Sequence, residues 1–200
     1  NDTSSNLYAD MNLNLKNKVI IVTGGSKGIG FGICMGLIKE GAIPHIVGRK
    51  INDIKSAIKV LNAEGGKSTY SIAELTDEVA CKKSISEVIK IHGRIDGLVN
   101  NAGVNDSVGL ENNSPTEFID SLKKNLVHYF TMTKYSLKYL KKSSGSIVNI
   151  GSKVSFTGQG NTSGYAAAKG GINSLTREWS LELLKYSIRV NTIIVAECYT

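Results

Sequence analysis

The chain has 200 residues, of which 41% are hydrophobic and 20% charged, and its formal net charge is +7. This length and composition favour one globular domain with a sizeable core, and no apolar run approaches membrane-spanning length. The lysines are scattered, with neither an arginine cluster nor an aromatic-interleaved strip among them. The positive charge therefore favours solvated helix faces over a nucleic-acid site, and it also suits a phosphorylated cofactor.

The chain contains three cysteines and three histidines, and neither set shows the spacing of a disulfide framework or a metal site. We therefore expect no metal and a reducing, cytoplasmic location. The first ten residues, NDTSSNLYAD, do not form a signal peptide. They predict a flexible extension or a cloning remnant, and the domain is expected to cover residues 11–200.

Strand-like and helix-like segments alternate along the chain. Apolar runs predict strands at 18–25, 43–49, 67–75, 96–103, 144–152 and 187–196. Helix formers predict helices at 31–42, 51–66, 77–93, 115–142 and 162–186. Segments that alternate at this spacing form βαβ units, so the sequence predicts an α/β fold with a doubly wound parallel sheet in a single domain.

The segment TGGSKGIG, residues 23–30, lies between the first predicted strand and the first predicted helix. Gly24, Gly28 and Gly30 follow G-x-x-x-G-x-G spacing. Residues without side chains let the backbone turn tightly and approach a pyrophosphate at the helix N-terminus. A glycine motif in this position is typical of a Rossmann dinucleotide-binding site, and a tight turn without a ligand is the lesser alternative.

The end of the second predicted strand indicates which dinucleotide binds. NAD sites carry an acidic residue here, whereas this chain has Arg49 and Lys50, with no acid before Asp53. Lys27 adds a positive charge inside the glycine loop. Cations around the adenosine ribose favour a 2′-phosphate, so we expect NADP, with NAD possible. The alternative is that these side chains are solvated surface charges.

The segment GYAAAKGG, residues 164–171, places a tyrosine and a lysine four residues apart in the last predicted helix. Positions i and i+4 lie on one helix face, so Tyr165 and Lys169 project together. Gly170 and Gly171 each cost roughly 1 kcal/mol relative to alanine in a helix, and they therefore predict a close contact. Taken alone, the pattern favours a close-packed helix that carries two surface polar groups.

Six segments together resemble the short-chain dehydrogenase/reductase family. They are TGGSKGIG, NNAG at 100–103, Asn125 in KKNLVHYF, Ser152 in IVNIGS, YAAAK at 165–169 and IRVN at 188–191. They occur in the family's order and spacing over residues 12–200. The resemblance implies an enzyme that transfers a hydride between a nicotinamide cofactor and an alcohol or carbonyl.

In that family a serine, a tyrosine, a lysine and an asparagine form the catalytic group, which matches Asn125, Ser152, Tyr165 and Lys169 here. A free tyrosine has a pKa of about 10 and is a poor base at neutral pH. The resemblance implies that the Lys169 ammonium and the charged nicotinamide stabilise the phenolate of Tyr165, which takes the hydroxyl proton. Ser152 would hold the reacting oxygen, Lys169 would also bind the nicotinamide ribose, and Asn125 would hold a water that links Lys169 to solvent.

The resemblance also assigns cofactor binding and indicates two departures from the family pattern. The assigned residues are Gly24, Ser26, Lys27, Gly28, Ile29, Gly30, Arg49, Glu74, Leu75, Asn101, Ala102, Gly103, Tyr165, Lys169, Cys198 and Thr200. After the sixth strand the family usually has Pro-Gly, where this chain has Val195-Ala196. Family members generally continue beyond the position of Thr200 through a substrate lid, a helix and a seventh strand. We therefore expect the chain to lack the C-terminal part of the fold.

Three further segments, at 101–111, 152–165 and 175–184, are similar to L-fucose dehydrogenase-type members of the family. That similarity implies oxidation of an aldose to its lactone. It assigns substrate binding to polar side chains that suit vicinal hydroxyls, namely Ser152, Lys153, Gln159 and Tyr165. Polar loop residues also favour turns without any ligand. The alternatives are a 3-oxoacyl or steroid-type carbonyl reductase and a non-catalytic nucleotide-binding protein.

The resemblance further implies a homo-oligomer, either a dimer or a tetramer, with a four-helix interface formed by residues 115–142 and 162–186. The expected partner is a small-molecule substrate, with neither nucleic acid nor membrane.

Overall fold

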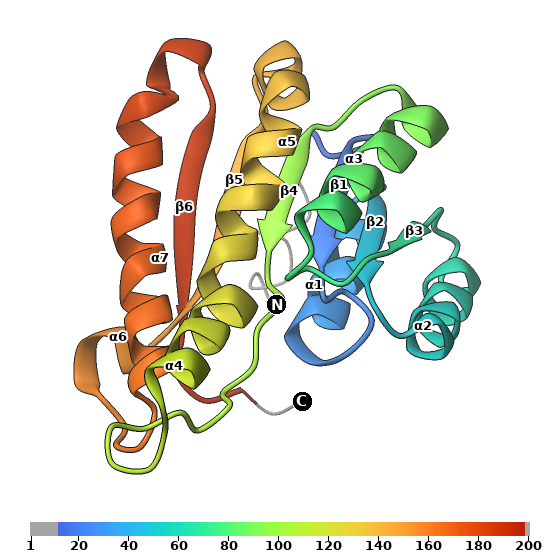
Figure 1. Ribbon diagram of the computed structural model, residues 1–200. Coiled ribbons are helices and arrows are strands. Elements are labelled where there is room, and N and C mark those ends of the chain that lie inside the picture. The colour runs from blue at the N-terminus through green and yellow to red at the C-terminus, as the bar shows by residue number, and fades with distance from the viewer. Residues whose placement is uncertain (1–11, 199–200) are drawn as a thin grey trace, which may run out of the picture.

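Six parallel strands form one sheet in the computed structural model, which describes residues 12–198 (Figure 1). The strands are β1 (Val19–Thr23), β2 (Ile43–Gly48), β3 (Thr69–Ile72), β4 (Gly97–Asn100), β5 (Ser146–Ser152) and β6 (Arg189–Val195). Their order is β3-β2-β1-β4-β5-β6, so the direction of winding reverses between β1 and β4. This order confirms the predicted doubly wound α/β fold, while the predicted extension at residues 1–10 lies outside the described residues.

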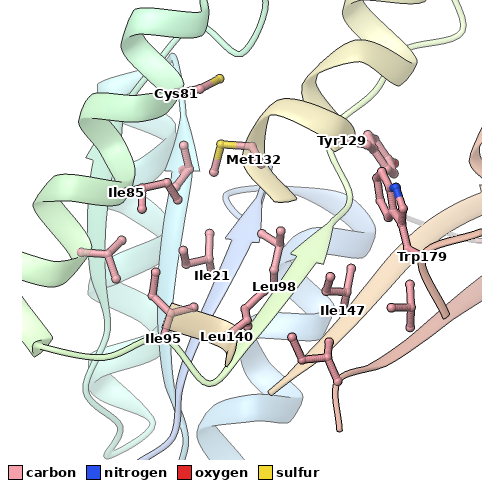
Figure 2. Close-up of a cluster of buried hydrophobic side chains, with 14 of the residues drawn as sticks. Ile21, Cys81, Ile85, Ile95, Leu98, Tyr129, Met132, Leu140, Ile147 and Trp179 are labelled. Carbon is pink, nitrogen blue, oxygen red and sulfur yellow. The ribbon is translucent and has the colours of Figure 1, made fainter. Parts of the chain in front are cut away.

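Helices cover both faces of the sheet. They are α1 (Gly28–Lys39), α2 (Ile51–Ala63), α3 (Glu78–His92), α4 (Pro115–Leu122), α5 (His128–Ser143), the short α6 (Val154–Thr157) and α7 (Ser163–Glu182). One hydrophobic cluster joins one face of the sheet to α3, α5 and α7 (Figure 2), and the other joins the opposite face to α1 and α2. Between residues 12 and 198, no helix is both long and apolar enough to cross a membrane.

Strand β1 shows why its sequence produces a two-sided core. All five of its residues are buried, and alternate side chains point to opposite faces of a strand. Val19 and Ile21 accordingly belong to the cluster under α3, α5 and α7, whereas Ile20 and Val22 belong to the cluster under α1 and α2. A continuous apolar run of this kind is typical of a parallel strand that is covered on both faces.

The long helix predicted at 115–142 is interrupted, and the structure corrects the prediction there. Ser114 and Glu117 form a capping box that starts α4, as the Ser114-Pro115 pair predicts. The helix then widens into a π-helical segment, Lys123–Val127, before α5 begins. Asn125 lies at the centre of this segment, and π-helical turns occur frequently at functional sites.

A chain of buried polar side chains crosses the core beside β4 and β5. Asn100 Nδ2 donates to Asn149 Oδ1 at 2.9 Å and to Thr133 Oγ1 at 3.2 Å. Asn149 Nδ2 donates to Thr176 Oγ1 at 2.9 Å, and that hydroxyl shares a hydrogen bond with Thr192. The hydrogen bonds therefore connect β4, β5 and β6 to α5 and α7, the helices that carry parts of the site.

A second buried polar group lies at the β2–β3 edge. The ring of His45, which is fully buried, bonds the hydroxyls of Thr69 and Ser71 through Nδ1 and Nε2, at 2.8 and 2.9 Å. Thr69 also bonds His92 Nε2 at 2.7 Å. Burial, with a smaller contribution from the charge of His92, lowers the pKa of His45 to about 3.

We expect the protein to lose stability as the pH falls from about 6.5 toward 3, because His45 stays neutral in the folded chain while it takes up a proton in the unfolded chain. Each such histidine contributes up to ~1.4 kcal/mol of lost unfolding free energy per pH unit in that window. Urea titrations at several pH values measure the slope. The His45→Gln variant should show a smaller slope, and an unchanged slope would contradict the assignment.

Candidate active site

The glycine loop joins the carboxyl end of β1 to the start of α1. Gly24 and Gly28 adopt φ values of +65° and +53°, which favour glycine. A Cβ on Gly30 would collide with the carbonyl oxygen of Gly24 and with the Asn101 amide. No side chain caps the first turn of α1, so its N–H groups are available to an anion. The loop therefore has the geometry that a pyrophosphate requires.

The ends of β1 and β4 are tied together beside this loop. Asn101 Nδ2 donates to the carbonyl oxygens of Thr23 and Gly24, at 2.9 and 3.3 Å. In return, Thr23 Oγ1 accepts from the backbone N–H groups of Asn101 and Ala102, at 2.9 and 3.1 Å. These hydrogen bonds fix the crevice at the point where the strand order reverses, which is where ligands bind in folds of this type.

A cavity of about 1540 Å³ runs along these strand ends. It brings together most of the residues predicted to bind cofactor, namely Gly24, Ser26, Lys27, Gly28, Ile29, Gly30, Arg49, Glu74, Leu75, Asn101, Ala102, Gly103, Tyr165 and Lys169. Ser152 lines it as well. Cys198, which is exposed, is outside this lining, and Thr200 lies outside the described residues.

The cations predicted near the adenosine ribose form ion pairs. Arg49 Nη1 lies 3.2 Å from Glu74 Oε2, and Lys27 Nζ lies 3.0 Å from Asp53 Oδ2. Burial tends to raise the pKa of Glu74, but hydrogen bonds from the Thr76 N–H and from Arg49 outweigh it and hold the pKa below its ordinary value. The Arg49 side chain is 70% exposed, so its ion pair is a weak surface interaction.

Lys169 lies in the first turns of α7, where it is buried against the carboxyl end of β5. Its Nζ donates to the carbonyl oxygen of Ile150 at 2.7 Å and to the hydroxyl of Tyr129 at 3.4 Å. The same Nζ lies 5.5 Å from the ring centroid of Tyr165, one helical turn before it. Burial lowers the pKa of Lys169 to about 8, so the amine remains largely protonated at neutral pH.

Ser152 is the last residue of β5, and it lines the cavity. Its Oγ accepts from the backbone N–H of Val154 at 3.3 Å, which leaves its proton available to a bound oxygen. The Ser155 hydroxyl donates to the Ser152 carbonyl at 2.6 Å, and Asn173 on α7 donates to Ser155 at 2.8 Å. The serine is therefore held from both α6 and α7.

Asn125 is fully buried in the π-helical segment. Its Oδ1 accepts from the Val104 N–H at 2.7 Å, and its Nδ2 donates to the Ser121 carbonyl at 3.1 Å. A Cβ on Gly103 would lie 3.0 Å from Asn125 Oδ1 and 3.7 Å from Lys169 Nζ, so these groups flank the same turn. The Asn125 side chain thus fixes the loop after β4 beside Lys169.

Two of the residues predicted to bind substrate lie outside the cavity lining. Lys153 forms an ion pair with Glu197 at 2.6 Å, and Gln159 Oε1 accepts from Asn105 at 3.3 Å. Their partners and Lys153 itself directly follow residues that line the cavity at or after the ends of β4, β5 and β6, and this part of the cavity is called its mouth below. Inside the mouth, Asp106 and Lys124 form a further ion pair at 3.5 Å, and both of these residues line the cavity.

Two residues of the site, His128 and Tyr129, have no counterpart among the residues predicted from the sequence. His128 lines the cavity, its Nε2 donates to the Lys124 carbonyl at 2.9 Å, and burial lowers its pKa to about 4. Within residues 12–198, its Nδ1 has no hydrogen-bond partner. The available signal was their spacing, because they follow Asn125 by three and four residues on one helix face.

The cavity thus combines the glycine loop with a serine, a tyrosine and a buried lysine. These are the groups that hydride transfer to or from a dinucleotide requires. The family model for short chain dehydrogenases matches residues 18–200. The chain belongs to the short-chain dehydrogenase family. It is therefore an oxidoreductase that uses a nicotinamide cofactor. Among residues 12–198, no group of three His, Cys, Asp or Glu side chains is arranged as metal ligands would be.

Individual members of the short-chain dehydrogenase family align with most of this chain. L-fucose dehydrogenase of Bos taurus is 33% identical over 92% of the chain and 67% of its own length. The 3-oxoacyl-[acyl-carrier-protein] reductase FabG of Chlamydia pneumoniae is also 33% identical, over 92% of the chain and 74% of its own length. The crystal structure of Cj0485 dehydrogenase superposes with a TM-score of 0.86 at 45% identity, over 94% of this chain and 71% of that one.

Proposed function

We propose that the protein is an NADP-linked dehydrogenase that oxidises the anomeric hydroxyl of an aldose, such as L-fucose, to the lactone. The observation that carries the reaction type is the buried Lys169 ammonium, 5.5 Å from the ring of Tyr165, in a cavity that Ser152 also lines. The sugar is supported by the L-fucose dehydrogenase relative and by the polar side chains around the mouth, among them Asp106 and Lys124.

The residues divide the chemistry of this oxidation. A bound dinucleotide would supply the hydride acceptor through its nicotinamide, and the glycine loop and the N-terminus of α1 would hold its pyrophosphate. Ser152 donates a hydrogen bond to the substrate oxygen, and Tyr165 takes the hydroxyl proton as the carbon loses its hydride. The positive charge of Lys169 favours the phenolate of Tyr165, and the reverse steps serve a reduction.

A second substrate class, a 3-oxoacyl or steroid-type carbonyl, is favoured by apolar side chains near the cavity. Val104, which is 49% exposed, lines the cavity together with Val195. Such surfaces suit an apolar substrate better than a sugar. The FabG relative supports this alternative.

The experiment that separates the two follows the absorbance of the reduced nicotinamide with L-fucose, D-arabinose, L-galactose, a steroid alcohol and a 3-oxoacyl thioester. Turnover of the sugars supports the proposal. Turnover confined to the last two would replace it with the carbonyl reductase. Loss of reaction with all five, while NADP still binds, would favour a nucleotide-binding role.

We propose NADP rather than NAD because no acid occurs between the end of β2 and Asp53, and because Lys27, Arg49 and Lys50 all line the cavity. The Arg49–Glu74 pair must open or turn to meet a 2′-phosphate. An exposed ion pair contributes about 0–1 kcal/mol, whereas a charge-assisted hydrogen bond contributes about 1.5–3 kcal/mol. The exchange is therefore favourable for the phosphate.

Replacement of Arg49 with aspartate should raise the Kd of NADP by about 10- to 100-fold and change the Kd of NAD much less. Fluorescence titration of both cofactors measures the change. Lys55→Asp is the matched control, because Lys55 is an exposed residue of α2 outside the cavity lining and gives the same change in charge. Equal Kd values for the two cofactors in the unmodified protein would refute the preference.

We also propose a cytoplasmic homo-oligomer that associates through α5 and α7. Val127, at the end of the π-helical segment, and Phe130 on α5 are 47% and 53% exposed, and Leu181 on α7 is 73% exposed. Apolar surface of this kind supports association with another copy. Light scattering of the purified protein gives the mass that tests it.

A further inference from the structure

We propose that Tyr129 is a positioning residue for Lys169, and that its hydroxyl holds the ammonium in place near Tyr165. The inference rests on the proposed catalytic role of Lys169. It adds a residue of α5 that lies outside the cavity lining and acts only through the lysine.

Three groups form a closed set of hydrogen bonds. Tyr129 donates its one hydroxyl proton to the Ile150 carbonyl at 3.1 Å, and Lys169 Nζ donates to the same carbonyl at 2.7 Å. The Tyr129 oxygen is then left as an acceptor, and Lys169 Nζ donates to it at 3.4 Å. Because Ile150 belongs to β5, Tyr129 to α5 and Lys169 to α7, the amine is held from three separate elements.

The closeness of the ammonium to two aromatic rings agrees with this arrangement. Lys169 Nζ lies 5.5 Å from the ring centroid of Tyr129 and 5.5 Å from that of Tyr165. Two of its three N–H groups are used by Ile150 and Tyr129. The third remains for the side on which Tyr165 and the cavity lie.

The electrostatics explain why this buried amine needs neutral acceptors. Among residues 12–198, no carboxylate lies within ion-pair distance of Lys169, although its side chain is buried. A buried charge must be compensated by hydrogen bonds. Burial raises the pKa of Tyr129 far above its ordinary value, so the hydroxyl stays neutral at every working pH and supplies a fixed dipole rather than a charge.

A purely structural role for Tyr129 accounts for the ring but not for the oxygen. The ring is fully buried within the cluster under α3, α5 and α7 (Figure 2). Its centroid lies 4.9 Å from that of the His128 ring. A phenylalanine would provide that packing. The hydroxyl adds a polar atom to an apolar cluster, and both of its interactions lead to Lys169 or to the carbonyl that binds Lys169.

The test replaces Tyr129 with phenylalanine and measures the protonation of Lys169 directly. Competitive labelling with trace acetic anhydride, in the protein without cofactor, gives the pH midpoint of the Lys169 amine by mass spectrometry. Loss of one acceptor disfavours the charged amine, so we expect the midpoint to fall by about one pH unit. The alkaline limb of the kcat–pH profile should move in the same direction. Tyr135→Phe is the matched control, because Tyr135 is on the same helix and its hydroxyl bonds Glu78 instead.

An unchanged midpoint in a folded Tyr129→Phe variant would overturn the proposal and leave Tyr129 as a packing residue. If that variant does not fold, Tyr129→Met tests the same loss of oxygen with a flexible apolar side chain. The outcome is separable from the proposed function. A shifted midpoint together with full turnover by Lys169→Ala would uphold the positioning and reject the catalytic role. An unshifted midpoint together with lost turnover by Lys169→Ala would reject the positioning by Tyr129 and uphold the catalytic role of Lys169.

Discussion

Replacement of Tyr165 with phenylalanine is expected to abolish turnover while the cofactor continues to bind. The change removes one oxygen from a half-buried ring, so the fold and the glycine loop remain intact. Proton transfer by a positioned side chain contributes about 10²–10⁴-fold to a rate, and we expect a loss at the upper end of that range because hydride transfer stalls without the proton acceptor.

The measurement pairs the rate of nicotinamide reduction with a fluorescence titration of NADP. The Kd should stay within about threefold of the unmodified value, since the phenol oxygen adds little to uniform binding. Tyr186→Phe, a change at a partly buried ring outside the cavity lining, is the control for loss of a tyrosine hydroxyl. A Tyr165→Phe enzyme with a near-normal rate at neutral pH would reject the assignment.

Replacement of Lys169 is expected to damage both turnover and cofactor binding. The ammonium is proposed to favour the phenolate and to bind the nicotinamide ribose, so its loss removes two interactions at once. We expect kcat to fall by about 10³-fold and the Kd of NADP to rise by about tenfold. This combined change distinguishes Lys169 from Tyr165, whose loss affects the rate alone.

Two variants separate the charge from the volume of this buried side chain. Lys169→Ala removes both and leaves a cavity, whereas Lys169→Met keeps much of the volume without the charge. The same loss of rate in both variants supports an electrostatic role. Retention of the rate and of NADP binding by Lys169→Met would show that only packing matters at this position.

The order of elements could be predicted from the sequence because most strands are short apolar runs and the long helices have local signals, whereas the short α6 was not predicted. The glycine loop was predicted for the same reason, since Gly24, Gly28 and Gly30 are adjacent to a strand and a helix. For the two glycines after Lys169, the sequence predicts close contacts, and the structure shows one at only one of them. A Cβ on Gly171 would lie 2.9 Å from Leu126, as the predicted close contact requires, but Gly170 faces open space and nothing in the structure explains it.

Features that depend on distant partners could not be predicted from the sequence. The π-helical segment arises where Asn125 bonds the backbone of Val104, on a loop after another strand. The ion pair of Arg49 with Glu74 depends on the pairing of β2 with β3. The role of Tyr129 could not be predicted because its hydrogen-bond partners, Ile150 and Lys169, are far away along the chain.

The buried hydrogen bonds through Asn100 and Asn149 also affect the register in which β5 pairs with β4. A shift of β5 by two residues would keep every side chain on its own face, so apolar patterning alone does not prevent it. Such a shift would place Asn149 opposite Leu98 instead of Asn100 and would separate it from Thr176. Each buried amide left without its partner costs about 1–3 kcal/mol. The hydrogen bonds of the two asparagines therefore favour the native register of β5 over a shift of two residues. Hydrophobic burial alone would tolerate that shift.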